Sequence, residues 1–219
     1  MSSVIAFPPR IKRFAERFRH SGYELYVVGG AVRDSLLGRA TDAYDFTTSA
    51  TPEETMRRFR RCIPTGIEHG TVTVIFENQQ FEVTTFRTDG TYGDRRHPDH
   101  VTFVPSLHAD LERRDFTINA IAYDPIAREV IDPHDGRGDL DKKVIRTVGE
   151  PYARFSEDAL RMLRAIRFAA TLHFSIERSV FGAISQLAPT ISAVAIERIR
   201  TELEKIMSSQ SPSIAWRMM

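Results

Sequence analysis

Two hydrophobic patterns divide the chain. Up to about residue 150, short apolar or alternating runs typical of strands are interspersed with helical patterns. The expected strands are residues 24–28, 44–49, 70–76, 81–87 and 101–104, and the expected helices are residues 10–21, 31–37 and 107–122, with another starting at Thr51. The polar residues 77–80 between two of these strands predict a hairpin.

After about residue 150 the pattern becomes almost entirely helical. Apolar residues recur at helical spacing over 156–172, 176–187 and 195–207. Ser156 is the expected N-cap of the first of these helices, since two acidic residues follow it. We therefore expect an α+β protein with a mixed domain at 1–150 and a helical domain at 151–219, the latter being the start of a longer helical region.

Composition excludes several classes of protein. The 219 residues are 42% hydrophobic and 27% charged, which is ordinary for a globular protein and not for a disordered or collagen-like one. No apolar run approaches the ~20 residues of a membrane span, and no secretory signal pattern opens the chain. The single cysteine, Cys62, excludes an internal disulfide and a cysteine-cluster zinc site. We expect a soluble, cytoplasmic protein with no membrane contact and no obligate protein partner.

The net charge restricts how a nucleic acid could bind. It is only +1, so the chain is not a general polycation, and a nucleic-acid partner would need a local basic patch. Two candidates are Arg10, Lys12, Arg13, Arg17 and Arg19 near the start, and Arg161, Arg164 and Arg167 later. Solvated helix faces are the commoner explanation of both runs.

A glycine pair follows the first expected strand. Gly29 and Gly30 permit close backbone approach where a helix begins, and the free N–H groups of a helix start bind phosphate well. Arg33 adds a bidentate phosphate donor. Taken alone, such a pair is more often just a tight turn.

Carboxylates on neighbouring strands indicate a metal site. Two carboxylates at i and i+2 of one strand point to the same face and can hold two metal ions for phosphoryl transfer. Asp45 lies on the strand at 44–49, and Glu82, on the strand at 81–87, could supply a further carboxylate. Taken without further context, Glu82 is better explained as an outward-facing charge on an edge strand.

Taken together, several segments resemble one known family. They are GGAVRDSLLG, YDFTTSATPEE, HGTVTVIF with FEVTTFRTDG, RRDFTINAIAYD, IDPHDGRGDL and RFSEDALRMLRAIRFA. In this order and spacing they resemble the class II tRNA nucleotidyltransferases, which are the CCA-adding enzymes and their bacterial poly(A) polymerase relatives in the polymerase β-like nucleotidyltransferase superfamily. The resemblance runs from about residue 22 to 207.

The resemblance implies a fold and a reaction. The fold would be a polymerase β-like head with a mixed sheet, followed by a helical neck. The reaction would be template-independent addition of C and A to the tRNA 3′ end from CTP and ATP, with two Mg²⁺ ions. Asp45 and Glu82 would be metal ligands, and Gly29, Gly30 and Arg33 would hold the triphosphate.

The resemblance also assigns residues to the incoming nucleotide. Asp158 and Arg161, in the neck, would read its Watson–Crick edge, because a carboxylate accepts and a guanidinium donates hydrogen bonds. At three residues apart on one helix, they are expected on one face. Arg114, Asp115, Asn119 and Arg164 are the other nucleotide-binding residues expected.

One position departs from the family pattern. The first residue of the expected Asp-x-Asp pair is Ala43, and the neighbouring Asp42 is one residue early, which on a strand would face the other way. We expect an engineered Asp→Ala change and low activity, and natural loss or rescue by Asp42 would also account for the alanine. The motifs are also compatible with an A-adding, CC-adding or poly(A) enzyme, or with an inactive RNA-binding homologue. The loop at 88–100 is expected to be mobile, and its length favours CCA or A addition.

Overall fold

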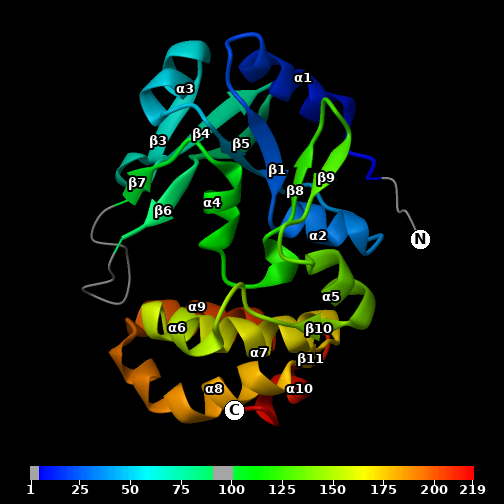
Figure 1. The fold of residues 1–219 in the computed structure, drawn as a ribbon, viewed down its shortest axis with the longest axis vertical. Coiled ribbons are helices and arrows are strands. Elements are labelled where there is room, and N and C mark those ends of the chain that lie inside the picture. The colour runs from blue at the N-terminus through cyan, green and yellow to red at the C-terminus, as the bar shows by residue number, and fades with distance from the viewer. Residues whose placement is uncertain (1–4, 91–100) are drawn as a thin grey trace. The chain divides into compact units, whose positions relative to one another are not determined.

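The computed structural model describes residues 5–90 and 101–219. They form two compact units (Figure 1). The first contains residues 5–89, 101–114 and 119–137, and the second contains residues 115–118 and 138–219. The expected mobile loop at 88–100 falls almost wholly outside the described residues, and the domain division expected at residue 150 stays a prediction.

A seven-stranded mixed sheet forms the centre of the first unit, in the order β3-β4-β5-β2-β1-β8-β9. Its strands are β1 (Leu25–Val28), β2 (Asp45–Thr48), β3 (Cys62–Gly66), β4 (Thr71–Phe76), β5 (Gln79–Thr85), β8 (Ala122–Asp124) and β9 (Glu129–Ile131). Within this sheet, β2 and β5 pair in parallel and all the other neighbouring strands pair antiparallel. The expected hairpin is β4–β5, with a two-residue turn at Glu77 and Asn78, which both have positive φ. A separate ribbon pairs β6 (Arg87–Asp89) with β7 (Val101–Phe103).

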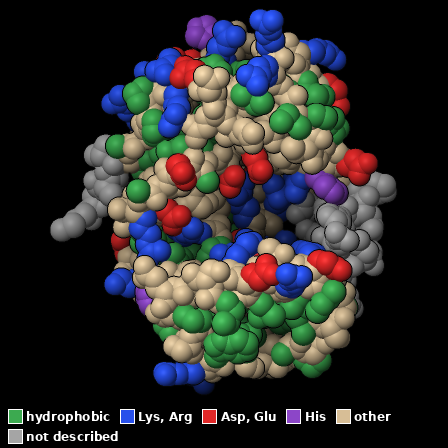
Figure 2. Space-filling view, turned by 180° about the vertical axis from the view of Figure 1, so that it is seen from behind, with side chains coloured by type: hydrophobic (Ala, Val, Ile, Leu, Met, Phe, Trp, Pro, Cys, Tyr) green, Lys and Arg blue, Asp and Glu red, His purple; other side chains and the backbone are tan. Residues whose placement is uncertain are grey.

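Two helices of this unit follow directly from local sequence signals. In α1 (Pro9–Arg19) the apolar positions Phe14 and Phe18 are buried, and the Phe14 ring lies 5.1 Å from that of Phe46 on β2. In α3 (Pro52–Arg58) the Thr51 side chain and Glu54 form the expected capping box. Figure 2 shows Lys and Arg side chains gathered at the end of the unit where Figure 1 places α1 and α3.

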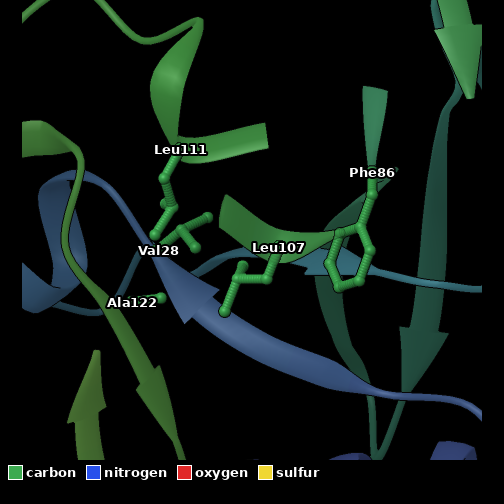
Figure 3. Close-up of a cluster of buried hydrophobic side chains, with 5 residues drawn as sticks. All are labelled: Val28, Phe86, Leu107, Leu111 and Ala122. Carbon is green, nitrogen blue, oxygen red and sulfur yellow. The ribbon is translucent and has the colours of Figure 1, made fainter. Parts of the chain in front are cut away.

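The opposite face of the sheet carries α4 (Leu107–Glu112), while α2 (Gly30–Leu36) follows β1. Leu107 and Leu111 of α4 pack against Val28, Phe86 and Ala122 in one buried cluster (Figure 3). Val28 faces this cluster whereas Phe46, whose backbone neighbour is Val27, faces α1, because side chains alternate across a strand. The two faces of the sheet therefore have separate helical covers.

The second unit is mainly helical. Its helices are α5 (Gly136–Lys142, which begins in the first unit), α6 (Pro151–Glu157), α7 (Leu160–Leu172), α8 (Arg178–Leu187), α9 (Ile196–Met207) and α10 (Pro212–Trp216). Two short parallel strands, β10 (Val144–Ile145) and β11 (Ser175–Ile176), accompany them. The α+β architecture expected from the sequence is confirmed. In this unit α5, β10, β11 and α10 were not predicted, and in the first unit neither were β3 and β9.

Two helix predictions are wrong. The helix expected at 107–122 ends at Glu112, and a 3₁₀ turn (Thr117–Asn119) and β8 follow. Residues 115–125 are all buried and so have no single apolar face, and Ala122 pairs with Val28 in the sheet. Ser156 is not an N-cap, because Pro151 starts α6 earlier and the Glu150 carboxylate accepts from the Ala153 N–H at 3.0 Å.

Candidate functional site

Asp45 and Glu82 are direct neighbours across the parallel strands β2 and β5. Paired residues of adjacent strands project from the same face, so the two carboxylates lie on the face of the sheet that also carries α4. Both side chains are exposed. The edge-strand explanation of Glu82 is wrong, because β5 lies between β4 and β2 inside the sheet.

The surroundings of Asp45 influence its charge in two opposing ways. Neighbouring protein atoms remove part of its hydration and raise the pKa of its carboxyl, while the Arg114 guanidinium lowers it, and the net pKa is raised. A divalent cation beside Asp45 would favour the ionised form.

The residues present fit one cation better than two. Mg²⁺ in proteins is held by one or two carboxylates together with substrate phosphates, and Asp45 with Glu82 matches that requirement. Position 43, where the resemblance led us to expect a further carboxylate, is an exposed alanine. Within the described ranges no group of three or more His, Cys, Asp or Glu side chains is placed to hold a metal ion.

Asp42 is not a member of the strand. It precedes β2, and its backbone carbonyl accepts from the Gln79 side chain at 3.0 Å. The Tyr44 hydroxyl donates to the Thr41 carbonyl at 2.9 Å. The strand argument against Asp42 therefore does not apply, and whether Asp42 replaces the missing carboxylate stays a prediction.

The glycine pair lies beside arginines of the first unit. Gly29 has φ 69° and ψ −132°, a conformation that a side chain strongly disfavours. A Cβ atom at Gly29 would lie 3.4 Å from Nη1 of Arg114, and one at Gly30 would lie 3.5 Å from Nη2 of Arg33. The glycines thus leave room for two guanidinium groups. Arg33 donates to Asn119 Oδ1 at 2.8 Å, which joins two of the segments expected to bind the nucleotide.

Asp34 and Asp110 orient these arginines, and the sequence did not single them out. Asp34 accepts two hydrogen bonds from Arg33, both at 2.9 Å. Asp110, on α4, is fully buried and accepts from Arg113 and, at 3.4 Å, from Arg114. It also accepts from the Thr47 hydroxyl of β2 at 3.1 Å, two residues from Asp45. The spacing of Asp110 and Arg114 as an i,i+4 pair was the available signal.

In the second unit, Asp158 lies between two helices. It caps the end of α6 with an extended backbone, so the expectation that Asp158 and Arg161 share one helix is wrong. Its Oδ1 accepts from the Leu160 N–H at 3.1 Å. Arg198 of α9 donates to both carboxylate oxygens, at 3.3 and 2.8 Å. Asp158 is thus held in place by the start of α7 and by α9.

Arg161 is held by the preceding helix. Its Nη1 donates to the Glu157 carboxylate and to the Arg154 carbonyl, the latter at 3.0 Å. Arg161 and Asp158 are both buried, at 7% and 9% exposure. Charged groups this buried need partners, and Glu157 and Arg198 provide them.

Asp115 and Arg164 pair within the second unit. Arg164 Nε donates to Asp115 Oδ2 at 2.8 Å, and the carboxylate raises the pKa of the Arg164 guanidinium. The Val148 N–H also donates to the Asp115 carbonyl, at 3.1 Å. Asp115 therefore lies in a different unit from its sequence neighbour Arg114. The roles expected for these residues toward a nucleotide stay predictions.

Comparison with known protein families identifies the domains that this chain contains. A model of the poly A polymerase head domain matches residues 25–146, more than half of the chain. The chain belongs to the poly A polymerase head domain family. Residues 173–219 also match a domain described as the probable RNA and SrmB-binding site of polymerase A. Members of this nucleotidyltransferase family generally use divalent metal ions.

Individual members of the family are similar over nearly the whole chain. The CCA-adding enzyme of Enterococcus faecalis is 53% identical over 186 residues, which are 85% of this chain and 46% of that protein. The crystal structure of the Bacillus stearothermophilus CCA-adding enzyme in complex with CTP has a TM-score of 0.90 and 43% identity, covering 97% of this chain and 52% of that one. A CCA-adding enzyme complex with ATP has a TM-score of 0.80 and 27% identity, covering 97% and 51%.

These matches confirm the family resemblance and the head-and-neck fold expected from it. The chain spans about half the length of the curated relatives it matches. No helix in the described part of this family member is long and apolar enough to cross a lipid bilayer.

Proposed function

We propose that this protein adds C and A nucleotides to the 3′ end of tRNA from CTP and ATP without a nucleic-acid template. The observation that carries the proposal is the pairing of Asp45 with Glu82 on the sheet face that carries Arg114. Paired carboxylates next to an arginine suit a reaction at a triphosphate, because the negatively charged phosphates must be held in place and their charge neutralised. Relatives that are CCA-adding enzymes support the choice of substrate.

The reaction joins the tRNA 3′-hydroxyl to the α-phosphate of the nucleotide. A phosphodiester bond forms, the bond between the α- and β-phosphates breaks, and pyrophosphate leaves. Gly29 and Gly30 allow the triphosphate to approach the backbone, and Arg33, already oriented by Asp34, donates to its oxygens. Asp45 and Glu82 would hold Mg²⁺, which when bound supplies electrostatic stabilisation of the phosphate oxygens.

Base selection belongs to the second unit in this proposal. Asp158 accepts and Arg161 donates hydrogen bonds at the Watson–Crick edge of the incoming base. Arg198 and Glu157 hold these two side chains in place, so little conformational entropy is lost when a base binds. Arg164, Asp115, Arg114 and Asn119 hold the sugar and phosphates.

Ala43 should limit the rate of this reaction in the chain as it stands. A missing metal ligand acts mainly on the transition state and so lowers the rate more than nucleotide binding. A loss of several kcal/mol of transition-state stabilisation corresponds to roughly a thousandfold or more in rate.

The decisive experiment supplies each nucleotide separately to a tRNA transcript that ends at the discriminator base. The whole protein that the gene encodes is compared with its Ala43→Asp and Ala43→Asn variants. We expect Ala43→Asp to raise CTP and ATP incorporation by orders of magnitude at similar nucleotide affinity, and Ala43→Asn, which has similar size but no charge, to raise it little. If the alanine form is fully active and Asp42→Ala abolishes its activity, Asp42 is the ligand.

The same assay distinguishes related activities. An A-adding, CC-adding or poly(A) enzyme would incorporate a different set of nucleotides in the Ala43→Asp form. Position 43 itself favours a second candidate, a catalytically inactive RNA-binding homologue, for which Ala43→Asp would restore nothing. A cytoplasmic location, expected from the sequence, is part of the proposal.

A further inference from the structure

A basic groove lies between α1 and α3 of the first unit. It has a volume of about 720 Å³ and is lined by Arg13, Arg17, His20, Arg57 and Arg58, with Glu16 as its one acidic residue. Basic side chains gather at this end of the unit (Figure 2). The whole chain carries a net charge of only +1, so this concentration is a local property of the surface.

The arginines of the groove differ in how they are engaged. Arg13 donates to both oxygens of Glu77, at 2.8 and 2.6 Å, and Arg58 lies 4.7 Å over the Tyr23 ring. Arg17 and Arg57 are exposed, and among the described residues neither side chain has an ion pair or a hydrogen bond. Two guanidinium groups thus remain available to an anionic ligand at the rim of a preformed groove.

The groove lies away from the candidate site. Its floor includes Phe76 of β4, on the sheet face that α1 covers, whereas Asp45 and Glu82 project from the face that carries α4. A ligand in the groove therefore does not take part in the reaction at Asp45. It would be a separate molecule or a distant part of a long substrate.

We propose that this groove, here called the α1–α3 groove, is a second RNA-binding surface that holds phosphates of the RNA backbone. Guanidinium groups match phosphate oxygens bidentately, and contacts of this kind bind RNA without reading its sequence. The choice of RNA over other polyanions rests on the proposed function, since that substrate is a long RNA.

An acidic protein partner fits the groove less well. Protein interfaces also use arginine, but they combine it with several apolar and aromatic anchors in a core that excludes water. In the α1–α3 groove Phe76 is the one aromatic lining residue and it is half-buried, while five of the eight lining residues are Arg or His. The lining thus resembles a phosphate-binding surface.

The test compares two double variants of the chain with equal loss of charge. Arg17→Ala/Arg57→Ala removes the two available guanidinium groups, and Arg137→Ala/Lys142→Ala removes two exposed cations from α5 as a control. The probe is a fluorescent RNA hairpin of about 12 base pairs, long enough to offer several phosphates but without a single-stranded 3′ end. Anisotropy titrations at several salt concentrations give the affinity and its salt dependence.

We expect the groove variant to bind the hairpin roughly tenfold more weakly at low salt, with a slope of log K against log salt that is shallower by about 1 to 2. The control variant should bind like the unchanged chain. The proposal is overturned if the groove variant binds normally, if the control loses as much affinity, or if poly-glutamate competes as well as RNA at equal charge. Nucleotide incorporation by the Ala43→Asp protein is measured separately, so failure of the proposed function is distinguishable from failure of the groove.

Discussion

Asp110 offers the sharpest test of how the first unit holds its functional residues. The carboxylate is fully buried. It accepts from Thr47 at 3.1 Å, from the Arg87 N–H at 3.3 Å, from Arg113 at 3.0 and 2.9 Å, and from Arg114 at 3.4 Å. Asp110→Ala removes one partner from each of these donors and leaves two guanidinium groups beside an apolar methyl.

The size of the effect follows from this geometry. Removing one partner of a buried charge network costs about 3–5 kcal/mol in the free energy of unfolding, because the remaining charges stay partly desolvated. For a chain of this size, such a loss lowers the melting temperature by about 6–20 °C. Asp110→Asn, which keeps the volume and one acceptor oxygen, should lose less.

The pH dependence of this stabilisation has a definite sign. Burial alone would raise the pKa of the Asp110 carboxyl. The neighbouring guanidinium groups of Arg114 and Arg113 lower it, and their effect outweighs that of burial, so the net pKa is lowered. A lowered pKa stabilises the folded state at every pH above the ordinary value of about 3.9 and loses this contribution as pH falls through the folded value. The difference in melting temperature between the unchanged chain and Asp110→Ala should therefore be constant from about pH 5 to 8 and shrink only in stronger acid.

Thermal unfolding followed by circular dichroism measures both quantities. Glu68→Ala is the matched control, because Glu68 is exposed and its loss should change stability by less than about 0.5 kcal/mol. A melting temperature for Asp110→Ala within about 2 °C of the unchanged chain would refute the reasoning, since one kcal/mol alone shifts it by that much.

Two further predictions concern selectivity, both in the Ala43→Asp background. Arg161→Ala should relax the preference for CTP and ATP over UTP and GTP. Arg198→Ala should relax it partly, because Asp158 then loses its ion pair. Single-nucleotide incorporation kinetics measure the preference in each variant. Arg200→Ala is the control, because the ion pair of Arg200 with Glu204 is exposed on the surface. Unchanged selectivity in Arg161→Ala would exclude Arg161 from the base-selecting site. Shortening the loop at 88–100 should leave C addition intact and impair A addition, whereas equal loss of both would indicate a role in folding only.

Much of the local structure could be predicted from the sequence, because it depends on short-range signals. The spacing of Phe14 and Phe18 predicted α1, and Thr51 with Glu54 predicted the capping box of α3. The polar residues 77–80 between two expected strands predicted the β4–β5 hairpin. The motif order indicated the family, which the comparisons confirm. These features require only neighbours in the chain or a recognised pattern.

Tertiary contacts decided what the local patterns left open. Residues 115–125 have an apolar content that local rules interpret as a helix, but they are buried on all sides, and pairing with β1 makes part of them a strand. Likewise, the continuous helical pattern across 156–172 is broken at Asp158, whose carboxylate is bound by Arg198, forty residues away in sequence. Hydrogen-bond partners at such a distance have no periodic signature in the sequence.

The candidate site shows the same division. The sequence by itself determined which residue types are present, including the alanine at position 43, where the family resemblance led us to expect an aspartate. The sequence and the family resemblance also indicated Glu82 as a partner of Asp45, but only the fold showed that their strands pair in parallel with these two residues in register. Only the fold buried Asp110 beneath Arg114, because a carboxylate is oriented by whichever donors surround it in space.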